Sequence, residues 1–232
     1  MKKEELQNLL ESIKQGDRPA VRKILNKGIK INQIRSKDIV PLVLAAKLGL
    51  NGIMEDLLKS GANPNQKTNR QVTALLESAN VLNYEGIELL LKHNADPNVE
   101  SYSGMTPLIY TSIKNDPECT ELLLTNKADP NRPNKNGDTA LIKASEVGNV
   151  GISALLLKYF ANPNLRNNKG VTSLLASVSR KHLELSSLLR KYNAKDDIPD
   201  ITGRTVFALE KSFDMENSNI NIKSNAINDI NV

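Results

Sequence analysis

A single pattern returns every 33 residues along most of this chain, and that period constrains the fold more than any other feature. Its clearest copy is the run Thr106, Pro107 and Leu108. The position of Leu108 is filled in turn by Leu42, Leu75, Leu108, Leu141, Leu174 and Phe207. In every copy except the first, a threonine stands two residues before that position. A fixed period of this length is typical of a solenoid, whose stacked repeats bury apolar faces that one repeat cannot bury by itself.

Each repeat is predicted to form two helices. Thr106 can cap the first helix by accepting N–H groups of its first turn, and Pro107 fits the first helical position, where a missing N–H costs nothing. Asp116 and Pro117 then end that helix and start a second one. A turn of the type Ala-Asp-Pro-Asn, as at 128–131, closes the repeat. We interpret its last asparagine as bonding neighbouring backbone groups of the same turn, a role that falls to Asn65, Asn98, Asn131 and Asn164.

The opening and closing motifs, in phase over successive copies, resemble the consensus of the ankyrin-repeat family from Lys3 to about Phe213. The resemblance implies an all-α repeat solenoid, an array of helix-turn-helix repeats with turn or β-hairpin fingers. We expect one domain over residues 1–213, with about six repeats and a partial C-terminal one. Residues 214–232 are rich in Asn, Ser and Ile without a clear period, which predicts a largely disordered tail. A short closing helix and a sorting signal are the alternatives for this tail.

The chain departs from the family consensus at several turn glycines. Gln71 replaces the finger glycine of the third repeat, and Leu82 and Asn115 replace glycines that end helices. The histidine that the family has after Thr-Pro-Leu is absent from every copy. We expect these substitutions to lower local stability without changing the fold.

No motif in the sequence indicates catalysis or a metal site. There is no Gly-rich phosphate loop, nucleophile elbow or cluster of metal ligands. Of the two histidines, His93 is expected at a helix C-terminus and His182 in a turn. The one cysteine, Cys119, excludes an intramolecular disulfide and is interpreted as a semi-buried thiol. We therefore expect no enzyme, no cofactor, no metal and no small-molecule substrate.

Charge and hydropathy restrict the partners and the compartment. A formal net charge of +5 and a pI of about 9.2 permit an acidic partner without demanding nucleic acid. The basic residues are spread out and are not interleaved with stacking aromatics, which disfavours nucleic acid. The start of the chain lacks the apolar core of a signal peptide, and no apolar run approaches the ~18 residues that span a bilayer. We expect a cytoplasmic monomer without membrane contact. The alternative is a protein exported to a host cell without an N-terminal signal, because heavy use of Asn, Lys and Ile hints at an AT-rich genome.

The family resemblance implies that another protein binds the concave face, which finger tips and first helices form. Positions that vary between repeats fall on this face in columns spaced by 33 residues. The predicted partner-binding residues are Lys37, Ile39, Arg70, Val72, Tyr102, Met105, Lys135 and Lys169. Tyr102 is the first candidate for a binding hot spot, because Tyr and Arg dominate such positions.

These columns suggest a partly apolar groove beside basic finger tips, with an inner-helix column at Leu48, Val81, Ile113 and Val147 along it. Such a groove fits an extended or helical segment of another protein that is apolar on one side and acidic on the other. The alternative is that Ile39 and Val72 pack inside their own hairpins and that the charges only solvate the tips. The function that follows is a protein-interaction scaffold or adaptor. A secreted effector that captures a host protein and a nucleic-acid binder that uses the basic tips are the alternatives.

Overall fold

The computed structural model describes residues 3–33 and 39–213. Its regular elements there are helices, with one isolated bridge residue at Ile39. The chain separates into two compact units, residues 1–135 and residues 136–232. The helical repeats agree with the expected all-α solenoid, whereas the predicted tail over 214–232 lies outside the described residues.

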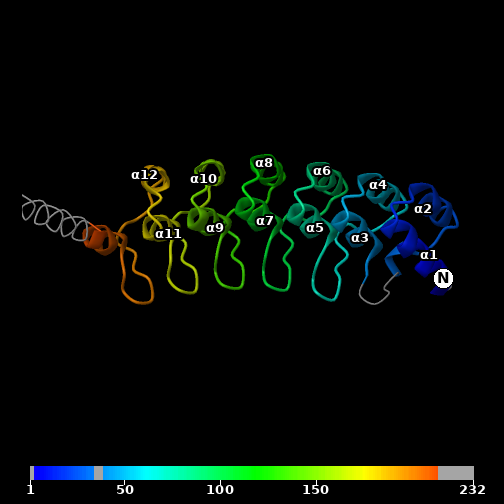
Figure 1. The fold of residues 1–232 in the computed structure, drawn as a ribbon, viewed down its shortest axis with the longest axis horizontal. Coiled ribbons are helices and arrows are strands. Elements are labelled where there is room, and N and C mark those ends of the chain that lie inside the picture. Colours follow the sequence, from blue (N-terminus) through cyan, green and yellow to red (C-terminus); the bar gives the residue numbers. More distant parts are fainter. Residues whose placement is uncertain (1–2, 34–38, 214–232) are drawn as a thin grey trace, which may run out of the picture. The chain divides into compact units, whose positions relative to one another are not determined.

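Unit 1 consists of two rows of helices (Figure 1). In the inner row, α1 contacts α3, α3 contacts α5 and α5 contacts α7, while α2, α4, α6 and α8 follow one another in the outer row. The inner helices are α1 (Lys3–Lys14), α3 (Pro41–Lys47), α5 (Ala74–Asn80) and α7 (Pro107–Ile113). The outer helices are α2 (Arg18–Leu25), α4 (Asn51–Lys59), α6 (Tyr84–Lys92) and α8 (Pro117–Thr125), and a short 3-10 turn, η1, covers Ile31–Gln33.

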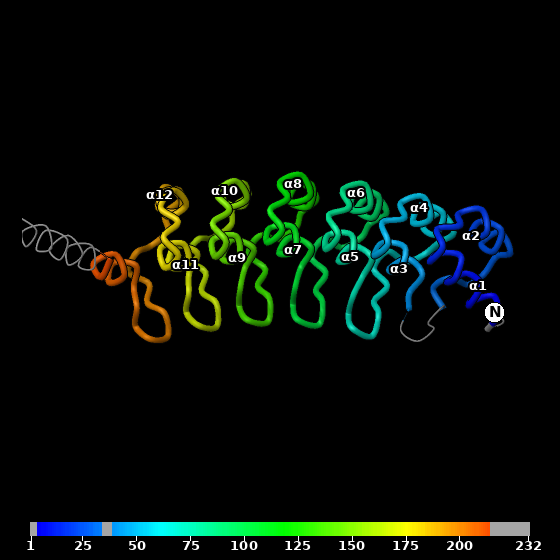
Figure 2. The backbone as a smooth tube through the Cα atoms, in the orientation of Figure 1, coloured from blue at the N-terminus to red at the C-terminus, as the bar shows by residue number. Residues whose placement is uncertain are grey.

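Unit 2 repeats the same arrangement. Its helices are α9 (Ala140–Val147), α10 (Val150–Lys158), α11 (Ser173–Ser179) and α12 (Leu183–Lys191), followed by helical residues 206–213. Within this unit α9 contacts α11 and α10 contacts α12. In both units the chain extends as a long finger before an inner helix (Figure 2). All the described helices are too short or too polar to cross a membrane.

The predicted helix caps are confirmed. Thr106 Oγ1 accepts the N–H of Ile109 at 3.2 Å, and Thr73, Thr139 and Thr172 cap their helices in the same way. Pro107 is the first residue of α7. Asp116 caps α8 by accepting the Cys119 N–H at 2.7 Å. Each cap satisfies a backbone donor that a helix of two turns would otherwise leave unpaired.

The leucine column forms the core between neighbouring repeats. Leu75, Leu108, Leu141 and Leu174 are at most 1% exposed, whereas Phe207, in the last copy, is 70% exposed. Burying a leucine side chain contributes about 1.5–3 kcal/mol, so this column supplies much of the stacking free energy.

The role predicted for the closing asparagines was wrong. Asn98 Nδ2 donates to the Lys127 carbonyl at 3.1 Å, and its Oδ1 accepts the Asp129 N–H at 2.7 Å. Its side chain therefore bonds the next repeat rather than its own turn. Within the turn itself, Asp96 Oδ1 accepts the Asn98 N–H at 2.9 Å. The side-chain amide of Asn98 is therefore available to bond the next repeat. Bonds of the same kind are made by Asn32, Asn65 and Asn164.

The residues that replace turn glycines adopt the left-handed conformation that glycine favours. Gln71, Leu82 and Asn115 have φ values of 60°, 57° and 58°. The same conformation occurs before the closing turn, at Gly61 (φ 85°) and at Phe160 (φ 65°). A side chain in this region costs roughly 1–2 kcal/mol, so the chain keeps the turn geometry at a cost in stability.

Candidate functional site

The predicted binding residues lie on fingers whose shape is fixed by hydrogen bonds within each finger. In residues 101–105, the Ser101 N–H donates to the Met105 carbonyl at 3.0 Å, and Ser101 Oγ accepts the Met105 N–H at 3.2 Å. Residues 68–72 and 167–171 are closed by the same pair of bonds. Val72 and Met105 therefore stand at a fixed position, directly before the threonine that caps the next inner helix.

Three of the predicted residues, Ile39, Arg70 and Val72, line one hollow of unit 1 with a cavity volume of about 430 Å³. We call this hollow the apolar groove. Its other lining residues are Val40, Val43, Leu44, Lys47, Thr68 and Glu77. Ile39 and Val72 are half-buried, so part of each side chain faces the cavity rather than the core.

The rim of the apolar groove is charged. Arg70 and Lys47 are exposed, and neither forms an ion pair with another described residue. Glu77 is half-buried and supplies the one acidic side chain among the lining residues. An apolar floor beside two exposed cations suits a ligand with neighbouring apolar and acidic groups.

Tyr102, Met105 and Lys135 are brought together at the next fingers of unit 1. Lys135 Nζ lies 3.8 Å from the centroid of the Tyr102 ring, and the Lys135 N–H donates to the Ser103 carbonyl at 3.1 Å. Asn134 Nδ2 lies 3.8 Å from the Met105 sulfur. Tyr102 is 72% exposed, so one face of an anchored aromatic side chain is open to a partner.

The two fingers at Tyr102 and Lys135 approach closely because the turn residue between them is glycine. A Cβ atom on Gly104, which has a φ of 77°, would lie 2.6 Å from the Lys135 backbone nitrogen. No real Cβ atom tolerates that distance, so a side chain here would push the fingers apart.

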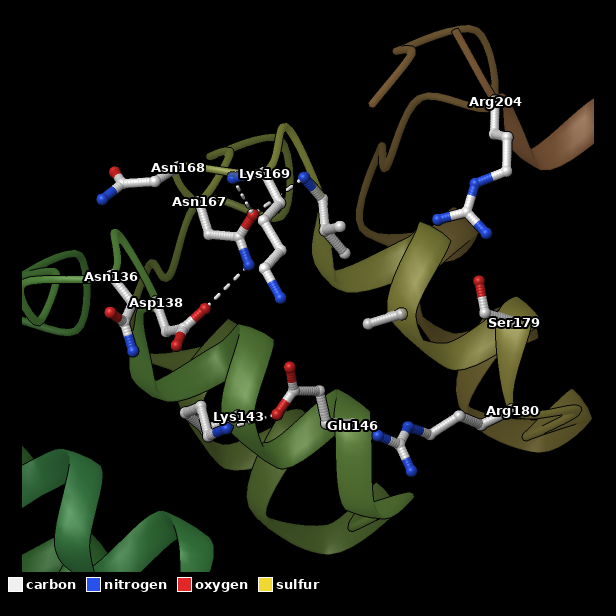
Figure 3. Close-up of a pocket in the computed structure, with 12 residues that line it drawn as sticks. Asn136, Asp138, Lys143, Glu146, Asn167, Asn168, Lys169, Ser179, Arg180 and Arg204 are labelled. Atoms are coloured by element: carbon white, nitrogen blue, oxygen red, sulfur yellow. Dashed lines mark hydrogen bonds and ion pairs between the residues drawn. The ribbon is translucent and has the colours of Figure 1, made fainter. Parts of the chain in front are cut away.

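The remaining two predicted residues do not join this site. Lys169 belongs to unit 2, where it lines a different hollow (Figure 3). Lys37 lies outside the described residues. The structure therefore groups six of the eight predicted residues in unit 1, at two neighbouring places: the apolar groove, and the fingers at Tyr102 and Lys135.

Sequence reasoning missed the contribution of α3 to the apolar groove. Val43, Leu44 and Lys47 line it together with the finger residues. The spacing of 43, 44 and 47 is the signal that predicts one helix face, but the inner-helix column was placed one residue further on, at Leu48. Leu48 is 46% exposed and does not line the groove.

The cysteine and the two histidines occupy structural positions in the fold. Cys119 is 1% exposed, so the prediction of a semi-buried thiol was wrong, and burial raises its pKa to about 12. His93 is the C-cap of α6 and His182 the N-cap of α12. Among residues 3–33 and 39–213, no group of three or more His, Cys, Asp or Glu side chains is placed to hold a metal ion.

Two ion-pair clusters were also missed. Asp56, only 9% exposed in its side chain, accepts bonds from Arg18 at 2.6 Å and from Arg22 at 2.9 Å, which ties α2 to α4. The bond from Arg18, assisted by Arg22 and opposed by burial, lowers the Asp56 pKa to about 2. In unit 2, Arg190 stands where the earlier repeats have Leu, and it bonds Asp196 and Glu210, both at 2.7 Å. The charged residue in an otherwise apolar column is the feature of the sequence that could have predicted this ion-pair connection between α12 and the helical residues 206–213.

Comparisons with known proteins agree with the architecture. A family model described as "Ankyrin repeats (3 copies)" matches residues 42–134 and 108–202. The chain is similar to the crystal structure of the ankyrin repeat domain of Bcl-3, described as a unique member of the IkappaB protein family. The TM-score is 0.80 at 25% identity, over 87% of this chain and 92% of that one. It is also similar to the crystal structure of EF0377, an ankyrin repeat protein, with a TM-score of 0.76 at 26% identity, over 81% of this chain and 98% of that one. No curated protein matches the chain.

Proposed function

This chain belongs to the ankyrin-repeat family, and from that premise we propose that it is an adaptor that binds a segment of a partner protein in the apolar groove of unit 1. Ankyrin repeats are in general protein–protein interaction modules, and their fold is in general a non-catalytic scaffold. The proposal adds the surface and the chemistry of the ligand.

One observation carries the proposal: Ile39 and Val72 form half-buried walls of a cavity of about 430 Å³, with Arg70 and Lys47 at its rim. A volume of this size holds a few side chains of a peptide. Apolar side chains in the cavity would be removed from water, which contributes about 25 cal/mol for each Å² buried. Acidic side chains beside them would meet the two cations. The preferred ligand is thus a segment with apolar residues on one side and Asp or Glu on the other.

The fingers at Tyr102 and Lys135 extend the same surface. Tyr102 offers a large area with few rotatable bonds, and its contact with Lys135 reduces the freedom that it would lose on binding. Met105, on the same finger as Tyr102 and in contact with Asn134, has a flexible, polarizable side chain that adapts to an irregular ligand. We assign Tyr102 the role of the main anchor outside the apolar groove.

The proposal is tested by affinity capture with two matched charge reversals. The first is Lys47→Glu with Arg70→Glu, at the rim of the apolar groove. The control is Lys23→Glu with Lys27→Glu, two exposed lysines on and directly after α2. Both variants change the net charge equally, and both must first melt at the wild-type temperature.

We expect one partner to be captured by the wild type and the control and lost by the groove variant. With the purified partner, the groove variant should bind at least tenfold more weakly than the control. Equal capture by all three proteins would contradict the assignment of the groove. Recovery of nucleic acid in place of a protein, with a steep dependence on salt, would favour the alternative function.

A further inference from the structure

A second hollow, wholly within unit 2, differs in chemistry from the apolar groove. Its cavity volume is about 540 Å³, and it lies between the fingers that precede α11 and the inner helices α9 and α11 (Figure 3). Four cationic side chains line it: Lys143, Lys169, Arg180 and Arg204. We call it the basic basin, defined by these four residues.

We propose that the basic basin is a second binding surface, which takes the carboxylate groups of an acidic segment of a partner protein. It goes beyond the function proposed for unit 1, because it uses other residues and another ligand chemistry.

The two carboxylates that line the basin are already engaged. Asp138 is 6% exposed and accepts a bond from Asn167 Nδ2 at 2.8 Å. Glu146 forms an ion pair with Lys143, which lies three residues earlier on α9. With four cations and these two carboxylates, the lining keeps an excess of two positive charges (Figure 3).

Two of the cations form no ion pair in the described part of unit 2. Lys169 and Arg180 are exposed and line the basin from the finger and from the end of α11. Neither side chain forms a hydrogen bond or an ion pair with another described residue. A carboxylate placed between them would gain charge-assisted hydrogen bonds without breaking an existing pair.

The backbone of the finger that carries Lys169 and the guanidinium of Arg204 are held in place before a ligand arrives. Asn167 Oδ1 accepts the N–H groups of Lys169 and Val171, both at 3.0 Å, and the Ile201 N–H donates to the Lys169 carbonyl at 3.0 Å. Asp200, whose side chain is 2% exposed, holds the Arg204 guanidinium through two bonds of 2.7 and 2.8 Å. A guanidinium has five N–H donors, so Arg204 keeps donors for a ligand. Fixed donors lower the entropic cost of binding.

The lining favours a carboxylate-bearing peptide over the other anionic polymers. None of the described residues around the basin is aromatic, so bases of a nucleic acid find no stacking surface. Val171 and Ala176 supply only small apolar areas. The cavity has room for several side chains, which a single inorganic anion would leave unfilled.

The test uses fluorescein-labelled hexaglutamate as the probe and labelled hexaglutamine as its uncharged counterpart, with the full chain at low salt. The basin variant is Lys169→Gln with Arg180→Gln, which removes both unpaired charges without introducing repulsion. The matched control is Lys191→Gln with Lys195→Gln, two exposed lysines of unit 2 outside the basin. Fluorescence anisotropy gives the affinities, and thermal melts establish that both variants fold.

We expect hexaglutamate to bind and hexaglutamine not to bind. The basin variant should lose at least tenfold in affinity and the control less than threefold. Equal losses in both variants, or no binding of hexaglutamate by the wild type, would overturn the proposal. It would also be overturned if a labelled twelve-residue oligothymidylate bound tighter than hexaglutamate and lost affinity in the basin variant.

The two surfaces are tested separately. The groove variant Lys47→Glu with Arg70→Glu should keep the hexaglutamate affinity of the basin, because its substitutions lie in unit 1. Loss of hexaglutamate binding in that variant would place the acidic ligand in the apolar groove and overturn the assignment to the basin.

Discussion

The side-chain nitrogen of Lys135 lies 3.8 Å from the centre of the Tyr102 ring, although 33 residues separate the two in the chain. The ring carries negative charge density on its face, so it attracts the ammonium group. This contact joins two neighbouring fingers and orients Tyr102, the one aromatic side chain among the predicted binding residues.

A double-mutant cycle of Tyr102→Ala and Lys135→Ala should therefore show coupling. At an exposed site the contact stabilises the fold by about 0.5–1 kcal/mol, measured as the free energy of unfolding in urea. The pair Tyr102→Ala and Lys92→Ala is the control, because Lys92 pairs with Glu88 on α6. Coupling of the same size in the control pair would mean that the contact contributes nothing specific.

Asp56 should make the free energy of unfolding depend on pH in the acidic range. Its pKa is lowered to about 2 by Arg18, from an ordinary value of 3.8 in the unfolded chain. A lowered pKa stabilises the fold above the unfolded value, and that stabilisation is lost as the pH falls from about 4 to about 2. We expect Asp56→Asn to cost roughly 1.5–3 kcal/mol at pH 7, the range for hydrogen bonds to charged groups.

At pH 2 the difference in midpoint urea concentration between the wild type and Asp56→Asn should be much smaller than at pH 7, because the carboxyl is then about half protonated in the folded wild type and almost fully protonated in the unfolded chain. The control is Asp197→Asn, which removes an exposed carboxylate of unit 2 and should change little at either pH. A gap between wild type and Asp56→Asn that stays constant from pH 7 to pH 2 would contradict the ion-pair explanation.

Ser153 and Ser186 occupy the same position in consecutive outer helices but differ in partners. Ser186 Oγ lies 3.0 Å from Ser177 Oγ and donates to the His182 carbonyl at 2.9 Å, while Ser153 Oγ is buried without a hydrogen bond among the described residues. We expect Ser186→Ala to cost about 1 kcal/mol and Ser153→Ala to be neutral or stabilising, since an unpaired buried hydroxyl is unfavourable. Thermal melts of the two variants provide the measurement. A larger loss for Ser153→Ala would refute this reading of the core.

Phe160 and Gly61 give a matched pair for left-handed strain. Both stand before the closing turn, with φ values of 65° and 85°, and a Cβ on Gly61 would meet no atom within 4 Å. Phe160→Gly should gain about 0.5–1 kcal/mol and Gly61→Ala should lose a similar amount, because only backbone conformation changes in the second case. If Phe160→Gly is less stable than the wild type, the exposed ring contributes packing that outweighs its strain.

The sequence predicted the features that recur within one repeat. Thr106, Pro107 and Asp116 are helix signals that act over three or four residues, so their roles follow from local chemistry. The bonds of Asn98 reach 29 and 31 residues along the chain, and a local interpretation assigned them to the wrong turn. Arg190 was visible as an exception in its column, but its partners Asp196 and Glu210 depend on how the last helix packs.

The binding surface was predicted in part for the same reason. The columns placed Ile39, Arg70 and Val72 on one face because successive repeats stack in register, and they placed Tyr102 above Lys135. The columns did not predict which residues of α3 line the apolar groove. The rotation of this two-turn helix about its own axis decides which side chains face the groove, and that rotation is set by the packing of Leu42 and Ala45 in the core. The columns also did not separate Lys169 from the other residues, because a strict period does not reveal where a chain divides into compact units.

The most direct test of the proposed function is photocrosslinking from two exposed tyrosines of unit 1. Benzoylphenylalanine replaces either Tyr102, on the finger surface, or Tyr84, on outer helix α6; their exposed fractions are 72% and 39%. The partner identified by capture is then irradiated with each protein. We predict a crosslinked product from position 102 and none from position 84. A product from position 84 alone would place the partner on the outer helices and contradict the account.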